Sequence, residues 1–560
     1  MRNKLIRVLF CTLLSLSLIG CGNDGSTVGS ERKQAVENGD SVSGSRTNAE
    51  LAESYRATTI ELDDTRILVD GNAVSTSDTD AVYAANDIVF YLEGQDFTYG
   101  EGTEEDEHSQ EEADAHTVVH ITKPGNYVVS GSLSKGQIAV DLGDGAKKKE
   151  DAVVTLILNN ADITCEVAPA VIFYNVYECG SDDAEDAAKD VDTSNAGANV
   201  IIADGSTNNV NGSYVARIYE SVELNEDGTE IIDSKKLHKY DAAFYSRRSM
   251  NINGEAENTG VLNIKAENEG LDTELHLTIN GGNINITSGN DGINTNEDGI
   301  SVTTINGGSV NIVVDGSTGE GDGIDSNGWL VINGGNVTTA ACSFSMDAGI
   351  DSDKGIHVNG GIVLATGNML DEIAESEQNY VVFSFDDLQK AGSSYELKNA
   401  DGNTLRTWTP MNDFSMLVFS DAELQAGMYT LYKDGEQLSV QSSNGMKGGR
   451  GGMMGGERPE LPKGERPQMP EGEEIPEMPA DGEMPPVPDA KLAEEDIAVP
   501  EGNPMMNQDG EWTDLDEIPK GEMPQGKGGF SNDFGNGETV TEFEIKDGGN
   551  MFRVVTTKSE

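Results

Sequence analysis

The sequence predicts an all-β fold, and within that class a right-handed parallel β-helix, a solenoid of short strands. The first observation is a repeated Asn-Gly motif, which is extended to Asn-Gly-Gly in all copies but the first. Its asparagines are Asn253, Asn280, Asn306, Asn333 and Asn359. Successive copies lie 26 or 27 residues apart. A fixed period in this range is typical of stacked repeats, in which no single unit can bury its apolar face alone.

The second observation is the alternation of apolar and polar residues around each asparagine. The residue immediately before it is always β-branched: Ile252, Ile279, Ile305, Ile332 and Val358. Four positions after it stand Ile284, Val310, Val337 and Val363. A period of two predicts strands, whereas a helical repeat would need apolar residues three and four apart. Glycine supplies corner angles that other residues avoid, so each repeat is expected to hold two or three short strands.

A further motif lies between the asparagine corners and adds a strand to each repeat. It consists of Gly, an apolar residue and then Asp or Asn, in segments 269–273, 291–295, 322–326 and 348–352. Segment 241–246 is a degenerate earlier copy. We expect strands of neighbouring repeats to pair about 4.8 Å apart, so that equivalent side chains form columns.

The N-terminal segment predicts export and lipid attachment. In residues 1–21, three basic residues precede an apolar run that ends in Leu-Ile-Gly-Cys, which is typical of a secretory signal peptide. Its end resembles a bacterial lipobox, whose cysteine, here Cys21, becomes the lipidated first residue. Residues 22–57 are expected to be a flexible tether. The sequence therefore predicts an extracellular protein, lipid-anchored to the bacterial cell membrane.

Charge and cysteine content limit the partners and the stabilising cross-links. The formal net charge is −62, which excludes nucleic acid as a partner because that affinity rests on Lys and Arg. Beyond the signal peptide stand Cys165, Cys179 and Cys342. Three cysteines do not make a disulfide scaffold, and a bridge between Cys165 and Cys179 is left open.

Residues 58–370 are assigned to the β-helix, with acidic loop insertions. Its first coils are less regular, with predicted strands at 88–92, 118–121, 127–131 and 153–158. Beyond the repeats, residues 376–442 predict a small antiparallel β module. Such a module would cap the open end of the solenoid, where unpaired strand edges invite aggregation.

The C-terminal part combines a low-complexity tract with a final return to strand. Residues 443–537 are rich in Gly, Met, Pro and Glu, a composition that cannot bury a core and predicts disorder. Alternation resumes in 538–560, so we interpret the tract as an insertion. The last strands are expected to return to the capping module.

A candidate cation site follows from the polar position of the further motif. The residue after each inward apolar residue gives an outward column: Tyr245, Asp272, Asn294, Asp325 and Asp351. Carboxylates about 4.8 Å apart repel by roughly 3.5 kcal/mol at an effective dielectric near 20, and a bound cation would relieve this. Calcium accepts oxygens from neighbouring strands, and beside the column stand Asp291, Asp322 and Asp347. The alternative is that these side chains cap tight turns through hydrogen bonds to the backbone.

Two other sets of polar positions have separate interpretations. The asparagine column is expected to be a structural side-chain ladder. Trp329 and His357 lie on an otherwise polar sheet face and would suit a sugar, although packing of Trp329 beneath a loop is the alternative. His276 and His357 are expected to be surface residues, because no cysteine completes a zinc site around them.

The repeated Asp-Gly-Ile-Asp-Ser and Ile-Asn-Gly-Gly motifs, after segments 241–246 and 250–254, resemble those of a bacterial family of carbohydrate-binding parallel β-helix lipoproteins. The family binds calcium and is similar to pectate-lyase-like polysaccharide lyases. The resemblance covers roughly residues 60–440 and is strongest over 240–365. It implies Ca²⁺ at Asp272, Asp291, Asn294, Asp322, Asp325, Asp347 and Asp351. Asn294, Ala348 and Tyr245 stand where the pattern has acids.

Three functions are compatible with these features. The first is a cell-surface lipoprotein that binds polysaccharide, such as cellulose or pectin, without catalysis. The second is a calcium-dependent polysaccharide lyase, for which Arg247, Arg248 and Lys354 are the basic residues near the column; arginine is a poor base, so the first function is preferred. The third is an adhesin or envelope scaffold.

Overall fold

Strands make up almost all of the regular structure, so the chain is all-β. The computed structural model describes residues 45–225, 227–237, 239–374, 376–442, 504–506, 512–514 and 538–555. The predicted signal peptide with Cys21 lies outside these residues, as does the tether up to residue 44. Within the described ranges, no helix is long and apolar enough to cross a membrane.

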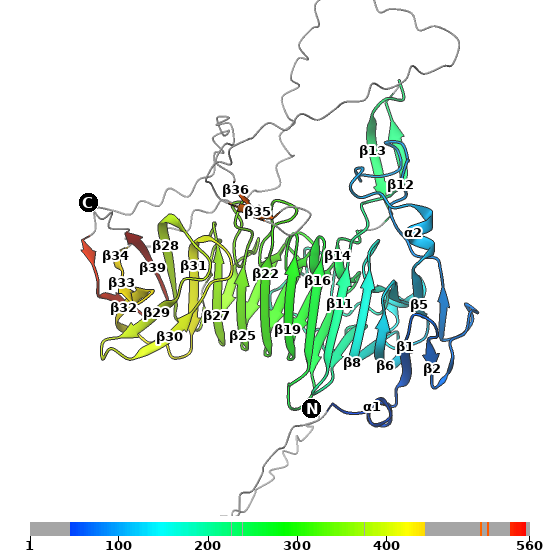
Figure 1. The fold of residues 1–560 in the computed structure, drawn as a ribbon, viewed down its shortest axis with the longest axis horizontal. Coiled ribbons are helices and arrows are strands. Elements are labelled where there is room, and N and C mark those ends of the chain that lie inside the picture. Colours follow the sequence, from blue (N-terminus) through cyan, green and yellow to red (C-terminus); the bar gives the residue numbers. More distant parts are fainter. Residues whose placement is uncertain are drawn as a thin grey trace, which may run out of the picture. The chain divides into compact units, whose positions relative to one another are not determined.

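Three ladders of strands carry the repeats (Figure 1). The last repeat adds a strand to the first two ladders only, because its segment 348–352, where the motif predicted a strand, forms no named strand. The first ladder is parallel and contains β1 (Thr58–Leu62), β6 (Gly125–Leu133), β8 (Val154–Cys165), β10 (Ala198–Ile202), β15 (Met250–Gly254), β18 (His276–Ile279), β21 (Val302–Ile305), β24 (Trp329–Ile332) and β26 (Ile356–Val358). The antiparallel strands β2 (Leu68–Val69) and β3 (Asn72–Ala73) extend it beyond β1.

The second and third ladders are built in the same way. The second is parallel and continues from the C-terminal half of β8 through β11 (Thr207–Gly212), β16 (Val261–Ala266), β19 (Asn283–Ser288), β22 (Ser309–Val314), β25 (Asn336–Ala340) and β27 (Ile362–Gly367). The third begins with β4 (Val82–Ala85), which is antiparallel to its neighbour, and continues in parallel through β5 (Thr117–Ile121), β7 (Gly136–Asp141), β9 (Val171–Asn175), β14 (Ala242–Ser246), β17 (Glu269–Thr273), β20 (Ile293–Thr295) and β23 (Ile324–Ser326).

The predicted inward columns form the core. The residues before the repeated asparagines, Ile252 to Val358, are in register and fully buried. Each such side chain contributes about 1.5–3 kcal/mol by leaving water. A polar member of the neighbouring column, Thr303, is satisfied across the interior, where its Oγ1 lies 3.1 Å from Oγ1 of Thr295. The alternation in the sequence thus decides which face of each strand is buried.

The asparagine column is the structural ladder that the sequence predicts. From Asn280 to Asn359, the Nδ2 of each asparagine donates a hydrogen bond at 2.9–3.0 Å to the Oδ1 of the asparagine one repeat earlier. Asn253 is the first acceptor of this series. The second ladder carries a shorter amide chain on its outer face, Asn209, Asn263, Asn285 and Asn311. Equivalent asparagine side chains of successive repeats therefore lie close enough together to form hydrogen bonds.

Close backbone approach explains the second glycine of each Asn-Gly-Gly corner. Gly282, Gly308, Gly335 and Gly361 have φ between 81° and 93°, which L side chains rarely adopt. A Cβ on Gly308 would lie 2.6 Å from the carbonyl oxygen of Gly282. The first corner, which has no second glycine, is held differently: Asn258 at φ 55° accepts from the Gly282 N–H of the next repeat.

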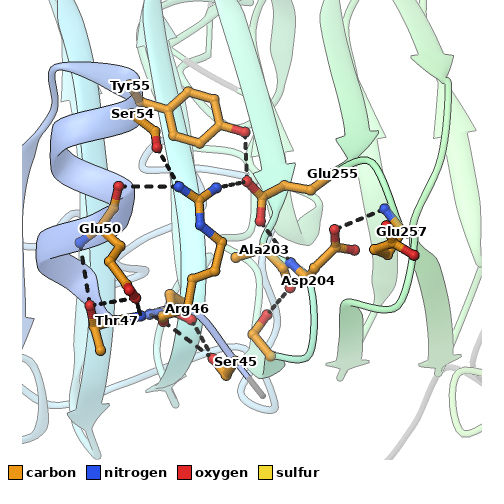
Figure 2. A network of polar contacts seen from close by, with 12 residues as sticks. Ser45, Arg46, Thr47, Glu50, Ser54, Tyr55, Ala203, Asp204, Glu255 and Glu257 are labelled. Carbon is orange, nitrogen blue, oxygen red and sulfur yellow. Dashed lines mark hydrogen bonds and ion pairs between the residues drawn. The ribbon is translucent and has the colours of Figure 1, made fainter. Parts of the chain in front are cut away.

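The chain before the first ladder contains a short helix, α1 (Asn48–Tyr55), where the sequence predicted flexible tether. A capping box joins Thr47 and Glu50 at its start, and Leu51 is fully buried against Val128 and Ile157. Figure 2 shows how Glu255, just after β15, holds this segment. Its Oε1 accepts from Arg46 Nη1 at 2.7 Å and from the Tyr55 hydroxyl at 2.8 Å. The tether prediction is therefore wrong for residues 45–57, because one apolar residue and a capping box fix them.

Short elements occupy the insertions. They are α2 (Gln110–Asp114), a 3-10 helix η1 (Ala146–Lys148), and the antiparallel hairpin β12 (Tyr219–Leu224) and β13 (Ile231–Lys236). The predicted strand at 88–92 is wrong. The strand that extends the third ladder is β4 instead, and Tyr91 of the 88–92 segment packs into the core without joining a named strand.

A C-terminal module follows the last repeat. Its strands are β28 (Tyr380–Gln389), β29 (Tyr395–Asn399), β30 (Thr404–Trp408), β31 (Phe414–Asp421), β32 (Gly427–Lys433), β33 (Glu436–Gln437), β34 (Ser439–Ser442), β37 (Thr539–Val540), β38 (Phe543–Ile545) and β39 (Gly549–Val555). β31 pairs antiparallel with β27 and so covers the last edge of the second ladder. The chain end returns to this module, since β38 pairs with β32 and β39 with β28. The β28–β39 pair is parallel, so the module is mixed rather than purely antiparallel.

The structure bears on two further expectations, one about the low-complexity tract and one about the cysteines. Within the predicted disordered tract, β35 (Pro504–Met506) and β36 (Trp512–Asp514) form an antiparallel pair, in a stretch where proline is absent between Pro504 and Pro519. The rest of that tract lies outside the described residues. Cys165, Cys179 and Cys342 are free thiols, which settles the open bridge, and burial raises the pKa of Cys165 to about 12.

Candidate cation and carbohydrate site

The third ladder places the predicted polar column in register. Leu271, Ile293 and Ile324 point into the core and are fully buried. Because side chains alternate along a strand, the next residue on each strand points away from that core. Asp272 therefore pairs with Asn294, and Asn294 with Asp325, on successive strands. Asp351 continues this order, because its N–H donates to the carbonyl of Ile324 at 2.7 Å.

The column points away from the core but is covered at its first positions. Asp272 is 0% exposed and Asn294 is 7% exposed. Asp272 Oδ1 accepts from Asn296 Nδ2 at 2.6 Å. Its Oδ2 has no partner among the described residues, and neither has Oδ1 of Asn294. Buried polar atoms without a hydrogen bond are rare in folded proteins, and each requires an explanation.

The acids beside the column behave differently, as caps of the backbone. Asp291 Oδ1 accepts from the Asp322 N–H at 2.6 Å, and Asp322 Oδ1 accepts from the Ala348 N–H at 2.5 Å, each on the next repeat. Asp347 reaches in the opposite direction, where its Oδ2 accepts from the Gly321 N–H at 2.7 Å. The turn-capping interpretation therefore holds for these three acids, while Asp272 and Asn294 are not used in this way.

Sequence reasoning missed two residues of this site. Glu269 precedes Gly270 as Asp291 precedes Gly292, so the repeat itself carried the signal. Glu269 is 7% exposed, and its Oε1 accepts from Asn294 Nδ2 at 3.1 Å while its Oε2 has no hydrogen-bond partner in the described part of the chain. Asn296 could not be found in this way, because it lies beyond the motif in the turn after β20.

Burial and mutual repulsion dominate the electrostatics. Burial, and then Glu269 and Glu274, raise the pKa of Asp272 well above its usual range, and burial with Asp291 and Asp241 does the same for the pKa of Glu269. Burial raises the pKa of Asp322 to about 9. Burial also raises the pKa of Asp291, Asp325 and Asp351 to about 7.

Nearby cations do not neutralise the buried acids. Arg217 pairs with Asp241 at 3.3 Å, and Lys239 lies 3.8 Å from Glu274. Among the described ion pairs, neither Glu269 nor Asp272 takes part. Glu269 and Asp272 therefore have no ion-pair partner within the described chain.

The donor set fits a hard cation, although it does not form a closed cage. In the described ranges, no three His, Cys, Asp or Glu side chains converge closely enough to enclose a metal ion by themselves. Among the described carboxylate and amide side chains, one buried oxygen nevertheless lacks a hydrogen-bond partner on each of Glu269, Asp272 and Asn294. Carboxylate and amide oxygens are ligands that calcium accepts in flexible geometry. The residues present thus match calcium in chemistry.

The two residues proposed for sugar contact share the outer face of the first ladder. Trp329 begins β24, and His357 of β26 is in register with Val331, so the two side chains are diagonal neighbours. Trp329 is partly exposed, and Lys354 Nζ lies 5.4 Å from the centre of its ring. The surface prediction is wrong for His276, which is 2% exposed. Its Nδ1 accepts from the Val302 N–H at 3.1 Å, and burial lowers the pKa of His276 to about 4.

Comparison with known proteins places the chain in a family. Residues 115–401, just over half of the chain, match the model of the family described as "Carbohydrate-binding domain-containing protein". The chain belongs to this family. The matched range contains every residue of the acidic column and the pair Trp329 and His357. Carbohydrate is therefore the class of partner that the family indicates.

A solved structure is also similar. The polysaccharide lyase-like protein from C. thermocellum, determined as a gadolinium derivative, is 19% identical with a TM-score of 0.30. The similarity covers 57% of this chain and 92% of that one. At this identity and score, the likeness carries no functional argument. No curated protein matches the chain.

Proposed function

We propose that the protein is a cell-surface lipoprotein that binds polysaccharide without catalysis, on a right-handed parallel β-helix stabilised by calcium. Family membership supports carbohydrate as the ligand. The three ladders, in which strands of successive repeats pair in parallel, support the β-helix. The lipobox ending at Cys21 supports lipid anchoring outside the cell.

One observation carries the calcium part of the proposal: buried oxygens of Glu269, Asp272 and Asn294 lack hydrogen-bond partners among the residues that the structure describes. Calcium would be held there, with Asp325 and Asp351 continuing the column beyond them. When bound, calcium supplies positive charge that offsets the repulsion between stacked acids. The capping acids Asp291, Asp322 and Asp347 hold the corners in place around it through their backbone hydrogen bonds.

The proposed polysaccharide lies along the outer face of the first ladder at Trp329 and His357. An exposed ring on a strand gives an apolar platform for one face of a sugar. Lys354 above the ring adds a donor for hydroxyl or carboxylate oxygens. A polymer such as cellulose or pectin suits this face because the strands repeat along the ladder.

The deciding experiment is a pull-down of the purified protein on insoluble cellulose and on pectin, with calcium or with chelator. Retention on one polymer that falls on chelation, and falls in Trp329→Ala, supports the proposal. Equal recovery from beads without glycan would contradict polysaccharide binding and favour the envelope scaffold.

One observation favours a polysaccharide lyase as the second candidate. Burial, and then the neighbouring Arg247, lower the pKa of Arg248, which is the direction that a general base needs. Incubation with polygalacturonate and calcium would show it: absorbance of unsaturated product accumulates if the chain is a lyase and stays at baseline if binding is non-catalytic.

A further inference from the structure

One column on the outer face of the first ladder changes its chemical character part-way along the ladder. The asparagine column begins at Asn253 of β15, which is in register with Ile201 of β10. Towards the N-terminus the same column continues with Ile157 of β8, Val128 of β6 and Thr59 of β1. Three aliphatic residues therefore occupy positions that asparagine fills in the later repeats.

Helix α1 covers the aliphatic part of this column. Leu51 is fully buried against Val128 and Ile157, and Ile201 packs against the same cluster. Further along, the column has three exposed members: Asn280, Asn306 and Asn333. The helix thus divides the outer face of the first ladder into a covered part and an exposed part.

The covered surface also carries side-chain amides, and oxygens of the helical segment accept from them. Asn126 Nδ2 donates to the carbonyl of Tyr55 at 2.7 Å. Asn159 Nδ2 donates to the carbonyl of Arg46 at 3.0 Å and to Oδ1 of Asn48 at 2.8 Å. An apolar floor with a few polar groups is the composition of many ligand-binding surfaces. The helical segment therefore occupies a surface that has the chemistry of a binding site.

Few contacts hold the helix on this surface. Of the eight residues of α1, Leu51 is the one that is buried. Glu255, which follows the first asparagine corner, accepts from Arg46 and Tyr55 on either side of the helix (Figure 2). A helix of this length is unstable in water without such docking. Loss of the Leu51 contact should therefore release α1 from the ladder.

We propose that α1 is an autoinhibitory strap, and that the surface beneath it extends the polysaccharide-binding face when the helix is released. The proposal rests on the proposed function, in which a polymer lies along the outer face of the first ladder. With α1 docked, such a polymer meets the helix at Ile201 and contacts only the later repeats. With α1 released, it also lies over Ile157 and Val128, where the amides of Asn126 and Asn159 donate to its hydroxyl oxygens.

The test compares the full chain with its variant Leu51→Asp, which places a charge in the apolar contact between α1 and the ladder. Amide hydrogen exchange in residues 48–55 should become faster, while exchange in β18 and β21 stays slow and reports an intact solenoid. Titration calorimetry with cellohexaose and with hexagalacturonate, at fixed calcium, measures affinity. For at least one probe it should rise at least about threefold, since the ligand gains apolar contact. Glu53→Gln, at an exposed position of α1, should leave exchange and affinity unchanged.

A second variant removes the same contact from the side of the ladder. Ile157→Asp should also release α1, and hydrogen exchange in residues 48–55 measures this. Affinity should not rise in this variant, because a charge now interrupts the apolar floor on which the ligand would lie. The pair of variants therefore separates uncovering of the aliphatic surface from release of the helix as such.

Three results would overturn the strap. The first is faster exchange in Leu51→Asp with an affinity for both probes that is unchanged or lower. The second is exchange that stays slow in this variant, because the helix would then not be releasable. The third is an equal gain in affinity in Ile157→Asp. If neither the unaltered protein nor Leu51→Asp binds a glycan, the proposed function fails, and that result differs from equal binding by both proteins, which overturns only the strap.

Discussion

Asn294 donates a hydrogen bond from its Nδ2 to Oε1 of Glu269, 3.1 Å away, on the neighbouring strand of the third ladder. Each of these side chains keeps one buried oxygen without a partner in the described part of the chain. An unsatisfied buried polar atom costs about 1–3 kcal/mol. A cation between the strands would remove this cost, and the following predictions depend on that relationship.

Asp272→Asn tests the buried carboxylate. In chelator, the variant is expected to be more stable than the unaltered protein by up to about 1–3 kcal/mol, because it removes an uncompensated buried acid. Calcium should then stabilise the variant less than it stabilises the unaltered protein. Denaturant unfolding with calcium and with chelator measures both effects. Asp144→Asn, at an exposed position, is the control and should leave both values unchanged.

The raised pKa values predict how stability depends on pH when calcium is absent. Folding raises the pKa of Asp325 and Asp351 to about 7 and the pKa of Asp322 to about 9. The folded state therefore binds protons more tightly than the unfolded state. This stability is fully present below the ordinary Asp pKa of about 3.9 and is lost as pH rises through 7 and then 9.

Thermal unfolding in chelator should thus show a Tm that falls between pH 5 and pH 9. Calcium should raise the Tm more at pH 8 than at pH 5, because Asp325 and Asp351 are mostly charged at pH 8 and mostly neutral at pH 5. A chelator effect of equal size at both pH values would show that these carboxylates do not hold the ion.

In the asparagine ladder, the loss of stability on substitution should depend on whether the asparagine lies inside the ladder or at its end. Asn306 both donates to Asn280 and accepts from Asn333, whereas Asn359 only donates, to Asn333. Asn306→Ala should therefore cost about 1–3 kcal/mol and Asn359→Ala about half as much, at roughly 0.5–1.5 kcal/mol for each net hydrogen bond. Urea unfolding measures the difference. Equal costs would mean that the corner backbone, not the amide chain, stabilises this edge.

Glu255→Gln tests how the N-terminal helix is held. The substitution removes the charge that pairs with Arg46 at 2.7 Å but keeps the shape of the side chain. Amide hydrogen exchange in residues 48–55 should become faster, with little change in β18 or β21. Glu257→Gln, two residues away, is the control. Unchanged exchange in the Glu255 variant would show that burial of Leu51 alone holds the helix.

The repeat in the sequence was sufficient to predict which residues face inward. Inward positions depend only on local alternation and on stacking, so Ile252 and Leu271 could be placed without coordinates. The asparagine ladder followed from the same spacing. What the sequence could not supply is coverage by segments outside the repeat, which is why His276 is buried although the register places it on the outer face.

Part of the candidate site could also be predicted from the register of the repeats. Register brings Asp272, Asn294 and Asp325 together as expected, but hydrogen bonds divide the acids into two groups. Asp291 and Asp322 cap backbone N–H groups of the next repeat, a choice that depends on side-chain rotamers. Asn296 lies outside every repeated motif, in the turn after β20.

Calcium binding at the buried acids is tested most directly by calorimetric titration of calcium into chelator-treated protein. We predict saturable binding to the unaltered chain, weakened at least about tenfold in the double variant Glu269→Gln with Asp272→Asn, because two charged ligands are lost. Asp144→Asn should titrate like the unaltered chain. An absence of saturable binding, or identical titrations for the double variant and the unaltered chain, would contradict a calcium site at Glu269, Asp272 and Asn294.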